Sequence, residues 1–492
     1  MITRWVCEKD KKKWIYPIEK CIYCKGPIKK IKSTKAKIIG ITKVNIPSPL
    51  HPIIPYNIIL LEDERGNRMP KKAMKDYKIG EAYEQKKAKT DGAVAITKIK
   101  YDIKEALAES LDLLKDMTIK ENDKVVIKPS IVEPAYAYQA VATNPKLVDA
   151  LISYLKEKNI KDIIVAEQSI FPDETVDAAQ KSGILDVCKK HNVQFVDLSK
   201  SEFIEKSMEG FVFRIAKEFF ERKIINVPVM KTNSQLGISG AMENMVRAAD
   251  KETQKNLYGG DIEKTLPRLI KILPEFLTIG DATIGMQGNG PTYLGEPAFL
   301  NMLFLSKDPV AVDAVFSEMG MFEMPEYLKE ACDFQVGNND TKSIEIVGDE
   351  LDAIRFHLKA PERFASAHPK INLIDGKADP YTFLSALKIT GKLVGILGYE
   401  INLVIGGHIN KESIGYKNRL VAYGNEAIKK LRDFGIKPIA EINEDMDDLE
   451  KIMLLKSVLE NLEKKGITSV DRIKSKFANL GQKSKTLFRI SD

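Results

Sequence analysis

The sequence predicts a multidomain α/β protein. A zinc ribbon and a small β-barrel come first, then a mostly parallel sheet flanked by helices, then a C-terminal α/β extension. Three observations lead to this fold class. The chain has 492 residues, more than one hydrophobic core usually organises. Three of its five cysteines fall within the first 24 residues. Beyond residue 92, short apolar runs alternate with amphipathic segments, a pattern typical of strands alternating with helices.

Composition excludes several classes of protein. With 44% hydrophobic and 29% charged residues, the chain is not wholly disordered. No stretch approaches about 20 uninterrupted apolar residues, so no membrane span is expected. The first residues lack the apolar block of a secretory signal, which predicts a cytoplasmic protein. Five cysteines are too few for a disulfide framework in a chain of this length.

The net charge of +7 is unevenly distributed. Residues 1–37 carry a net +9 and residues 464–492 a net +6, which leaves −8 for the residues between them. Basic ends could meet an acidic partner such as a nucleic acid, or they could simply be solvated, lysine-rich termini. Charge blocks alone do not decide between these alternatives.

The first predicted domain, residues 1–36, is the zinc ribbon. Cys7 and Asp10 are separated by two residues, and Cys21 and Cys24 repeat that spacing. Two ligands on one tight turn can reach the same ion, and a second such turn completes a tetrahedral site. We therefore predict one structural zinc held by three thiolates and one carboxylate, although Asp10 is a harder ligand than cysteine. The alternative is a degenerate ribbon that holds no metal.

The second predicted domain, residues 37–90, is the small β-barrel. The runs 36–44 and 56–62 have the composition of strands, separated by a Pro-rich loop at 47–55. The charged stretch 85–92 is interpreted as the linker to the next domain.

About the first 85 residues resemble the zinc-ribbon/OB-fold family, whose members accompany thiolases and acyl-CoA enzymes in archaea and bacteria. The residues that carry the resemblance follow the cysteine ribbon: Gly40, Val44, Pro55, Tyr56, Glu62, Ile79, Gly80 and Glu84. Asp10 departs from the four-cysteine form of the family. The resemblance implies an OB-type barrel that could dock a partner enzyme, and it makes a CoA-linked ligand plausible.

The third predicted domain, residues 91–335, contains the main parallel sheet, and residues 336–492 form the C-terminal extension. Strands are expected at 124–128, 162–167, 194–198, 224–229, 277–284 and 299–305, with helices after Asn144, over 175–191 and after Asp308. Ligands of open α/β sheets bind outside the carboxyl ends of the strands.

Several charged side chains are predicted at that edge. Lys128, Glu167, Lys231 and Asp308 each close an apolar run, and Asp281 interrupts another. Together they could hold an anionic or metal-bound small molecule. Individually, Asp308 could only cap its helix, Asp313 could only favour a helix start, and Lys128 could be a solvated strand end.

Lys231 is the strongest of these candidates. It ends a strand and opens into Lys-Thr-Asn, and the segment 237–244 then enters a helix, an arrangement suited to an anion. A phosphate-binding P-loop motif is absent, and the glycine-rich run 285–290 leads into a proline, so it fails as a dinucleotide fingerprint.

Residues from about 93 to 320 resemble the family called domain of unknown function 362. The matching motifs are Lys128-Pro129, Thr143-Asn144-Pro145, Pro228 with Lys231-Thr232, Gly240-Ala241 with Asn244, Asp281 with Gly285 and Gly290-Pro291, and Asp308-Pro309 with Asp313. Departures from the family pattern are Ser130, Asn233 and Glu243. Many relatives carry an iron–sulfur module. This chain lacks a closely spaced four-cysteine run, so no such cluster is expected, and Cys188 and Cys332 are predicted to be buried structural thiols.

The sequence therefore predicts a protein acting on a small anionic metabolite, either a carboxylate or a CoA thioester. The predicted catalytic residues are Lys231, Lys128 and Asp281, and the predicted ligand-binding residues are Thr143, Asn144, Thr232, Asn244 and Gly290. A divalent cation could lie with Asp308, Asp313 and Glu167. The alternatives are a non-catalytic scaffold for a partner enzyme, and nucleic-acid binding through the basic N-terminal module. Residues 38–90 offer few aromatic side chains for base stacking, which argues against nucleic acid.

Overall fold

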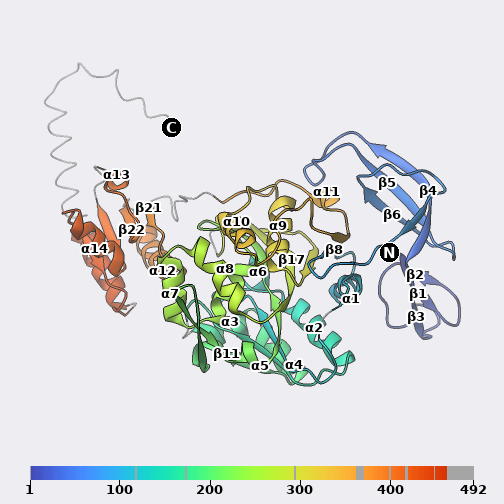
Figure 1. Ribbon diagram of the computed structural model, residues 1–492, viewed down its shortest axis with the longest axis horizontal. Helices are drawn as coiled ribbons and strands as arrows, with labels where there is room; N and C mark the ends of the chain where they lie inside the picture. Colours follow the sequence, from blue (N-terminus) through green and yellow to red (C-terminus); the bar gives the residue numbers. More distant parts are fainter. Residues whose placement is uncertain are drawn as a thin grey trace, which may run out of the picture. The chain divides into compact units, whose positions relative to one another are not determined.

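The computed structural model describes residues 2–116, 119–171, 174–292, 295–361, 371–397, 401–415, 419–447 and 449–461. The chain divides into two compact units, residues 1–363 and 364–492. The first unit contains both N-terminal sheets and the large central sheet (Figure 1). The basic segment 464–492 lies outside the described residues.

The central sheet confirms the predicted fold class. Its strands lie in the order β11-β10-β9-β14-β17-β19-β8-β20. Their bounds are β8 Val94–Lys98, β9 Val125–Pro129, β10 Ile163–Glu167, β11 Gln194–Asp197, β14 Lys223–Val227, β17 Phe276–Gly288, β19 Met302–Ser306 and β20 Ile346–Gly348. The five strands from β11 to β17 are all parallel. Three further strands extend the sheet at β17: β15 Val229–Asn233, β16 Gly237–Ser239 and β18 Gly295–Ala298.

Two layers of helices cover the two faces of this sheet. Val125 and Ile127 of β9 pack in one apolar cluster, whereas Val126 between them packs in the other. The strand is therefore apolar throughout, as expected where both faces are covered. One layer contains α1 Ile103–Leu113, α2 Pro145–Glu157, α3 Thr175–Lys181 and α4 Ile184–His191; the other contains α6 Ala241–Asn244, α7 Lys251–Gly259, α8 Ile262–Ile272, α9 Pro309–Met319 and α10 Glu326–Asp333.

Two predicted elements are interrupted in the structure. The helix expected over 175–191 is two helices, because Gly183 adopts a left-handed backbone conformation (φ 84°) between α3 and α4. The strand expected over 224–229 ends at Val227. Pro228 has no N–H to donate to a sheet, and β15 begins after it on a different set of partners.

β19 runs antiparallel to both of its neighbours, β17 and β8. Its carboxyl end therefore lies at the opposite edge of the sheet from the carboxyl ends of β9, β10, β14 and β17. Strand β8, two positions along from β17, points the same way as β17, so Lys98 at its end lies at the carboxyl edge of the sheet.

The N-terminal region consists of two small antiparallel sheets. The ribbon sheet has the order β2-β1-β3, with β1 Ile2–Cys7, β2 Lys13–Trp14 and β3 Ile28–Ser33. The second sheet has the order β6-β5-β4-β7, with β4 Lys35–Val44, β5 Tyr56–Glu62, β6 Arg68–Ala73 and β7 Ala82–Glu84. It stands where the sequence predicts a small barrel, and β6 and β7 form its edges.

Polar contacts join the second small sheet to the end of β20 in the central sheet. The Lys71 ammonium of β6 lies 3.3 Å from the Asp349 carboxylate, and the Met74 amide donates to Glu350. The predicted linker, residues 85–92, also forms hydrogen bonds within the first unit. The Lys89 and Thr90 amides both donate to the carboxylate of Glu345, just before β20. Residues 336–348, placed in the predicted C-terminal extension, thus contribute a strand to the first unit.

The second unit is a smaller parallel α/β sheet. Four neighbouring strands run parallel in chain order: β21 Ile371–Gly376, β22 Ile401–Gly406, β23 Leu420–Tyr423 and β24 Ala440–Ile442. The helices are α12 Pro380–Leu397, α13 Lys411–Ile414 and α14 Asn425–Asp433. Across the described parts of both units, no helix combines the length and apolar character needed to cross a membrane.

Candidate functional site

The four predicted ligands of the ribbon converge. One ligand atom from each of Cys7, Asp10, Cys21 and Cys24 lies within 4.8 Å of all the others. The Cys7 and Cys24 sulfurs are 3.4 Å apart, and the Cys21 thiol donates to Asp10 Oδ2 at 3.1 Å. A tetrahedral site with metal–sulfur bonds of about 2.3 Å has ligand–ligand edges of about 3.8 Å. This group can therefore hold a metal ion.

The two ligand turns have the same backbone hydrogen bonds, which explains how an aspartate fits. In the first turn the Asp10 amide donates to Cys7 Sγ at 3.4 Å, and Lys11 N donates to Cys7 O. In the second turn the Cys24 amide donates to Cys21 Sγ at 3.4 Å, with the equivalent second bond to Cys21 O. The residue after each second ligand is left-handed in both turns. Asp10 thus occupies the backbone position of a fourth cysteine.

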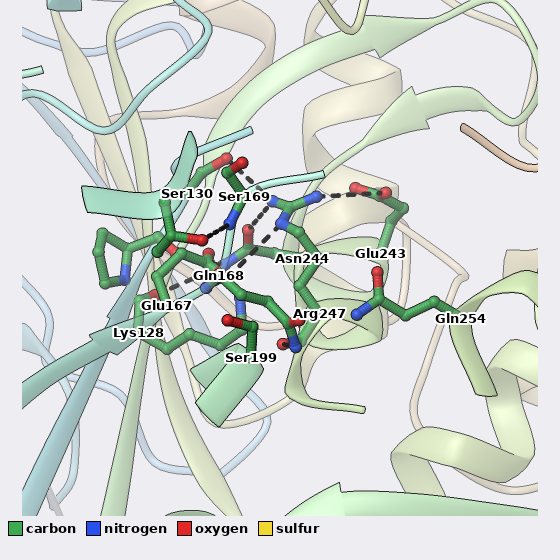
Figure 2. A network of polar contacts seen from close by, with 12 residues as sticks. Lys128, Ser130, Glu167, Gln168, Ser169, Ser199, Glu243, Asn244, Arg247 and Gln254 are labelled. Atoms are coloured by element: carbon green, nitrogen blue, oxygen red, sulfur yellow. Dashed lines mark hydrogen bonds and ion pairs between the residues drawn. The ribbon is translucent and has the colours of Figure 1, made fainter. Parts of the chain in front are cut away.

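A second polar cluster lies at the carboxyl edge of the central sheet, inside the fold (Figure 2). Lys128 ends β9 and Glu167 ends β10, and their side chains form an ion pair of 2.8 Å with both groups fully buried. Arg247 approaches the other oxygen of Glu167 at 3.6 Å and lies 3.9 Å from Glu243. Tyr258 and Ser239 also donate to Glu243, at 2.5 and 2.8 Å. The arginine therefore bridges two buried carboxylates.

Lys231 lies beside this cluster without a counter-ion of its own. It is 2% exposed, and its ammonium donates to the backbone oxygen of Val141 at 3.3 Å. Within the described ranges, no carboxylate lies at ion-pair distance from its Nζ atom. Burial, together with repulsion from Arg247, lowers its pKa to about 7, against weaker attraction from Glu243, Glu133 and Glu167. An amine with this pKa can hold an anion or exchange a proton near neutral pH.

Burial also lowers the pKa of Lys128, to about 8, but here Glu167 opposes the shift through a direct ion pair. The two lysines thus differ in whether they have an ionic partner. Lys128 has a carboxylate partner within the protein, whereas Lys231, among the described residues, donates only to the backbone oxygen of Val141.

Arg247 and Glu243 are central to the cluster, and the sequence analysis did not select them as site residues. The sequence nevertheless contains a signal for this ion pair. Met242–Ala249 is apolar apart from Glu243, Asn244 and Arg247, and a glutamate four residues before an arginine in such a run indicates a buried ion pair on one helical face. Gln168 was missed as well; its side chain donates to the backbone oxygens of Arg247 and Ala249.

Asp281 lies at the carboxyl edge of the central sheet, where it connects β17 to the start of α2. It accepts hydrogen bonds from the Asn144 amide at 2.7 Å and from the Thr283 hydroxyl at 2.7 Å. Thr143 accepts from the Ser130 amide and donates to Val227 O, both at 2.7 Å. Burial raises the pKa of Asp281 above its ordinary value. These contacts hold the 131–143 loop, and with it Val141, against Lys231.

The other predicted ligand-binding residues also lie near this edge. Thr232 follows Lys231 in β15, and its hydroxyl approaches Met286 O at 3.5 Å. Asn244 donates to Asn226 at 2.8 Å and accepts from Arg247 at 3.0 Å, so it orients the arginine. A side chain at Gly290 would place its Cβ 2.1 Å from Thr232 O, so this position requires glycine for close backbone approach.

The structure does not bring Asp308 to the carboxyl edge of the sheet, where Glu167 and Asp281 lie. Asp281 pairs with Leu303 across the antiparallel β17–β19 ladder, and Asp308 lies five residues further along, about 17 Å away at the opposite edge. Asp308 caps α9 by accepting from Ala311 N at 2.9 Å. Asp313 accepts from the amides of Ala241 and Met242 at the start of α6, and burial raises its pKa to about 7. In the described parts of the chain, the ribbon ligands form the one group that could hold a metal.

The remaining cysteines differ from each other. Cys188 is buried in the core as predicted, and burial raises its pKa to about 11, whereas Cys332 is half-buried.

Comparison with known proteins identifies the central domain. Residues 125–318 match the family model described as domain of unknown function (DUF362), which confirms the resemblance predicted for residues 93–320. The chain is also similar to a solved structure titled "Ltp2-ChsH2(DUF35) aldolase". The match has 18% identity and a TM-score of 0.15, and it covers 18% of this chain and 75% of that chain. No curated protein matches the chain.

The buried, unpaired ammonium predicts a specific pH dependence of stability. Lys231→Met keeps the length of the side chain and removes the charge. Below pH 7 the lysine is protonated in both the folded and unfolded states, so the full desolvation penalty applies and the variant should be more stable. As pH rises from about 7 towards 10.4, the folded state releases the proton first, so the advantage of the variant should shrink.

Thermal melts of both proteins between pH 6 and pH 9.5 measure this effect, and a difference in Tm that does not change with pH would contradict it. Lys223→Met, at the exposed start of β14, is the matched control and should show no such trend.

Arg247 should behave in the opposite way. Arg247→Met leaves Glu167 and Glu243 without their shared cation, so we expect a loss of about 3–5 kcal/mol in unfolding free energy at pH 7. Denaturant unfolding of the variant beside Lys231→Met makes the comparison. Equal stability of the two variants would show that Arg247 does not hold the carboxylates in the folded state.

Proposed function

We propose that the central domain binds and acts on a small anionic metabolite, a carboxylate or a CoA thioester, at the carboxyl edge of its sheet. The observation that carries this proposal is the Lys231 ammonium, buried with a single backbone acceptor. A buried cation without a counter-ion is unfavourable unless something else in the protein's working cycle pairs with it. A ligand carboxylate or phosphate is such a partner.

The neighbours of Lys231 support an anionic ligand in preference to a metal. Arg247 lies close enough to depress the pKa of Lys231, so two cationic groups face the same region. Two of the three carboxylates that attract Lys231, Glu243 and Glu167, are already engaged by Arg247 and Lys128. Lys231 would hold the anion and, because its pKa lies near 7, could transfer a proton to or from it. Lys128 and Asp281 would position the surrounding strand ends.

A second candidate function is a non-catalytic scaffold that docks a partner enzyme. The Pro-rich loop of the N-terminal module favours it, since Ile46 and Leu50 are 81% and 72% exposed. The resemblance of this module to acyl-CoA-associated OB-fold proteins points to an enzyme of acyl-CoA metabolism as the partner. In that case Ile46→Asp with Leu50→Asp would abolish function, and Lys231→Met would preserve it.

We also propose that the ion held by the ribbon is zinc. Three thiolates and one carboxylate form a soft, four-coordinate donor set that suits zinc better than magnesium or calcium. Four protein ligands leave no open position for water, so the ion would be structural. The ribbon core consists mainly of Trp5, Trp14 and two of the ligands themselves, so metal binding would contribute much of its folding energy.

The proposed ligand should depend on Lys231. Native mass spectrometry of the gently purified full-length protein should find an anionic metabolite on the wild type, whose mass distinguishes a free carboxylate from a CoA thioester. Lys231→Met should lose it, because the apolar side chain cannot pair with an anion, while Lys223→Met should keep it. Retention of the same metabolite by a folded Lys231→Met protein would refute the assignment of the site.

The ribbon predicts how zinc affinity changes with the fourth ligand. Elemental analysis of the full-length protein should give one zinc per chain. Asp10→Cys should bind it more tightly against a competing chelator, since a thiolate is the softer ligand, and Asp10→Ala should bind it more weakly. Cys332→Ala, outside the site, should match the wild type. An unchanged affinity in both Asp10 variants would show that Asp10 is not a ligand.

A further inference from the structure

A cavity of about 340 Å³ lies within the first unit, where the ribbon sheet, the second small sheet and α1 meet β8. These elements carry the labels β1, β3, β6, β8 and α1 in Figure 1. Its size is that of an ordinary small-molecule site. It is separate from Lys231 and from the ribbon ligands, none of which lines it.

One side of the cavity carries cations that form no ion pair with a described carboxylate, although the charge of Lys100 contributes to lowering the pKa of Asp349. Lys30 and Lys32 in its wall pair with Glu105 and Asp112 of α1. By contrast, among the residues that the structure describes, Lys98 and Lys100 have no carboxylate at ion-pair distance. Lys98 ends β8, Lys100 lies two residues beyond it, and both line the cavity. Lys100 instead lies 3.8 Å from the sulfur of Met69.

Arg4 adds a third cation to this side. It donates to two backbone oxygens, those of Thr3 and Arg68, and to no carboxylate in the described parts of the chain. The group of Arg4, Lys98 and Lys100, here called the basic wall, is suited to a multiply charged anion such as a phosphate or diphosphate.

The other sides of the cavity offer a different chemistry. Tyr101 and Ile15 line it and are 56% and 48% exposed, so a flat or apolar group could pack on them. The Asp102 carboxylate, just before α1, accepts from the Glu105 amide through Oδ1 and can also accept from a hydroxyl or amino group. A ligand that matches the basic, the aromatic and the acidic side of the cavity has an anionic end, a flat ring, and hydrogen-bond donors.

The position of the cavity in the fold also favours a ligand. Lys98 pairs with Met302, which pairs with Ala282 of β17, so the basic wall stands at the carboxyl edge of the central sheet. This edge is where open α/β sheets bind their ligands.

We propose that this cavity binds a nucleoside phosphate. The phosphates would contact Lys98, Lys100 and Arg4, and the base would pack against Tyr101. A hydroxyl group of the sugar would donate to the carboxylate of Asp102. The site is additional to the one at Lys231, and neither requires the other.

Isothermal titration of the full-length protein with three probes tests the proposal: ADP, pyrophosphate and adenosine. ADP should bind at least tenfold more tightly than either of the others, because it alone engages both the basic wall and the tyrosine. The double variant Lys98→Ala/Lys100→Ala should weaken ADP binding at least tenfold. Lys43→Ala/Lys86→Ala removes the same charge from exposed positions outside the cavity, and should bind ADP as the wild type does.

Tyr101→Ala, at an exposed position, provides a second variant that should remain folded. It should weaken ADP binding and leave pyrophosphate binding unchanged. Lys231→Met should bind ADP normally. The proposal is overturned if ADP does not bind, if pyrophosphate binds equally well, or if the basic-wall variant keeps wild-type affinity. Loss of ADP binding in Lys231→Met alone would place the nucleotide at the other site and overturn it as well.

Discussion

The burial of one ammonium group, that of Lys231, is the constraint on which the account of the central domain depends. Moving a cation out of water is unfavourable by several kcal/mol even after the protein relaxes. The chain nevertheless places this group at a strand end with one backbone oxygen beside it and Arg247 close by. An anion that pairs with Lys231 would explain why the ammonium is buried. Unfavourable side-chain environments of this kind concentrate at functional sites.

The rest of the domain positions this group. Parallel strands bring Lys128 and Glu167 to one edge, where they neutralise each other, and Lys231 beside them forms no ion pair with a described residue. Arg247, oriented by Asn244, holds the remaining carboxylates in place. Asp281 fastens the loop that carries the acceptor of Lys231. Close packing at Gly290 allows the neighbouring backbone segments to meet. The residues shared with the family motifs thus serve largely to build the surroundings of one lysine.

The sequence predicts much of the fold and of the candidate site. The predictions that are wrong or missing have identifiable physical reasons. Apolar runs ending in Lys128 and Glu167 located the strand ends, and repeated ligand spacing located Asp10. Strand direction, however, cannot be inferred from the composition of a single strand. Asp308 was therefore assigned to the wrong edge, because β19 is antiparallel to its neighbours. Arg247 was missed because its partners come from other elements, which only the tertiary structure brings together.

The central claim is tested most directly by measuring the titration of Lys231 itself. Lysine-selective ¹³C and ¹⁵N labelling, with the Lys231 signal assigned by its absence from Lys231→Met, gives its pKa by NMR. A buried ammonium without an ion pair should titrate near pH 7 in the ligand-free protein, and its pKa should rise when the native metabolite is added, because an anion stabilises the charged form. A value near 10.5 that the metabolite leaves unchanged would contradict it.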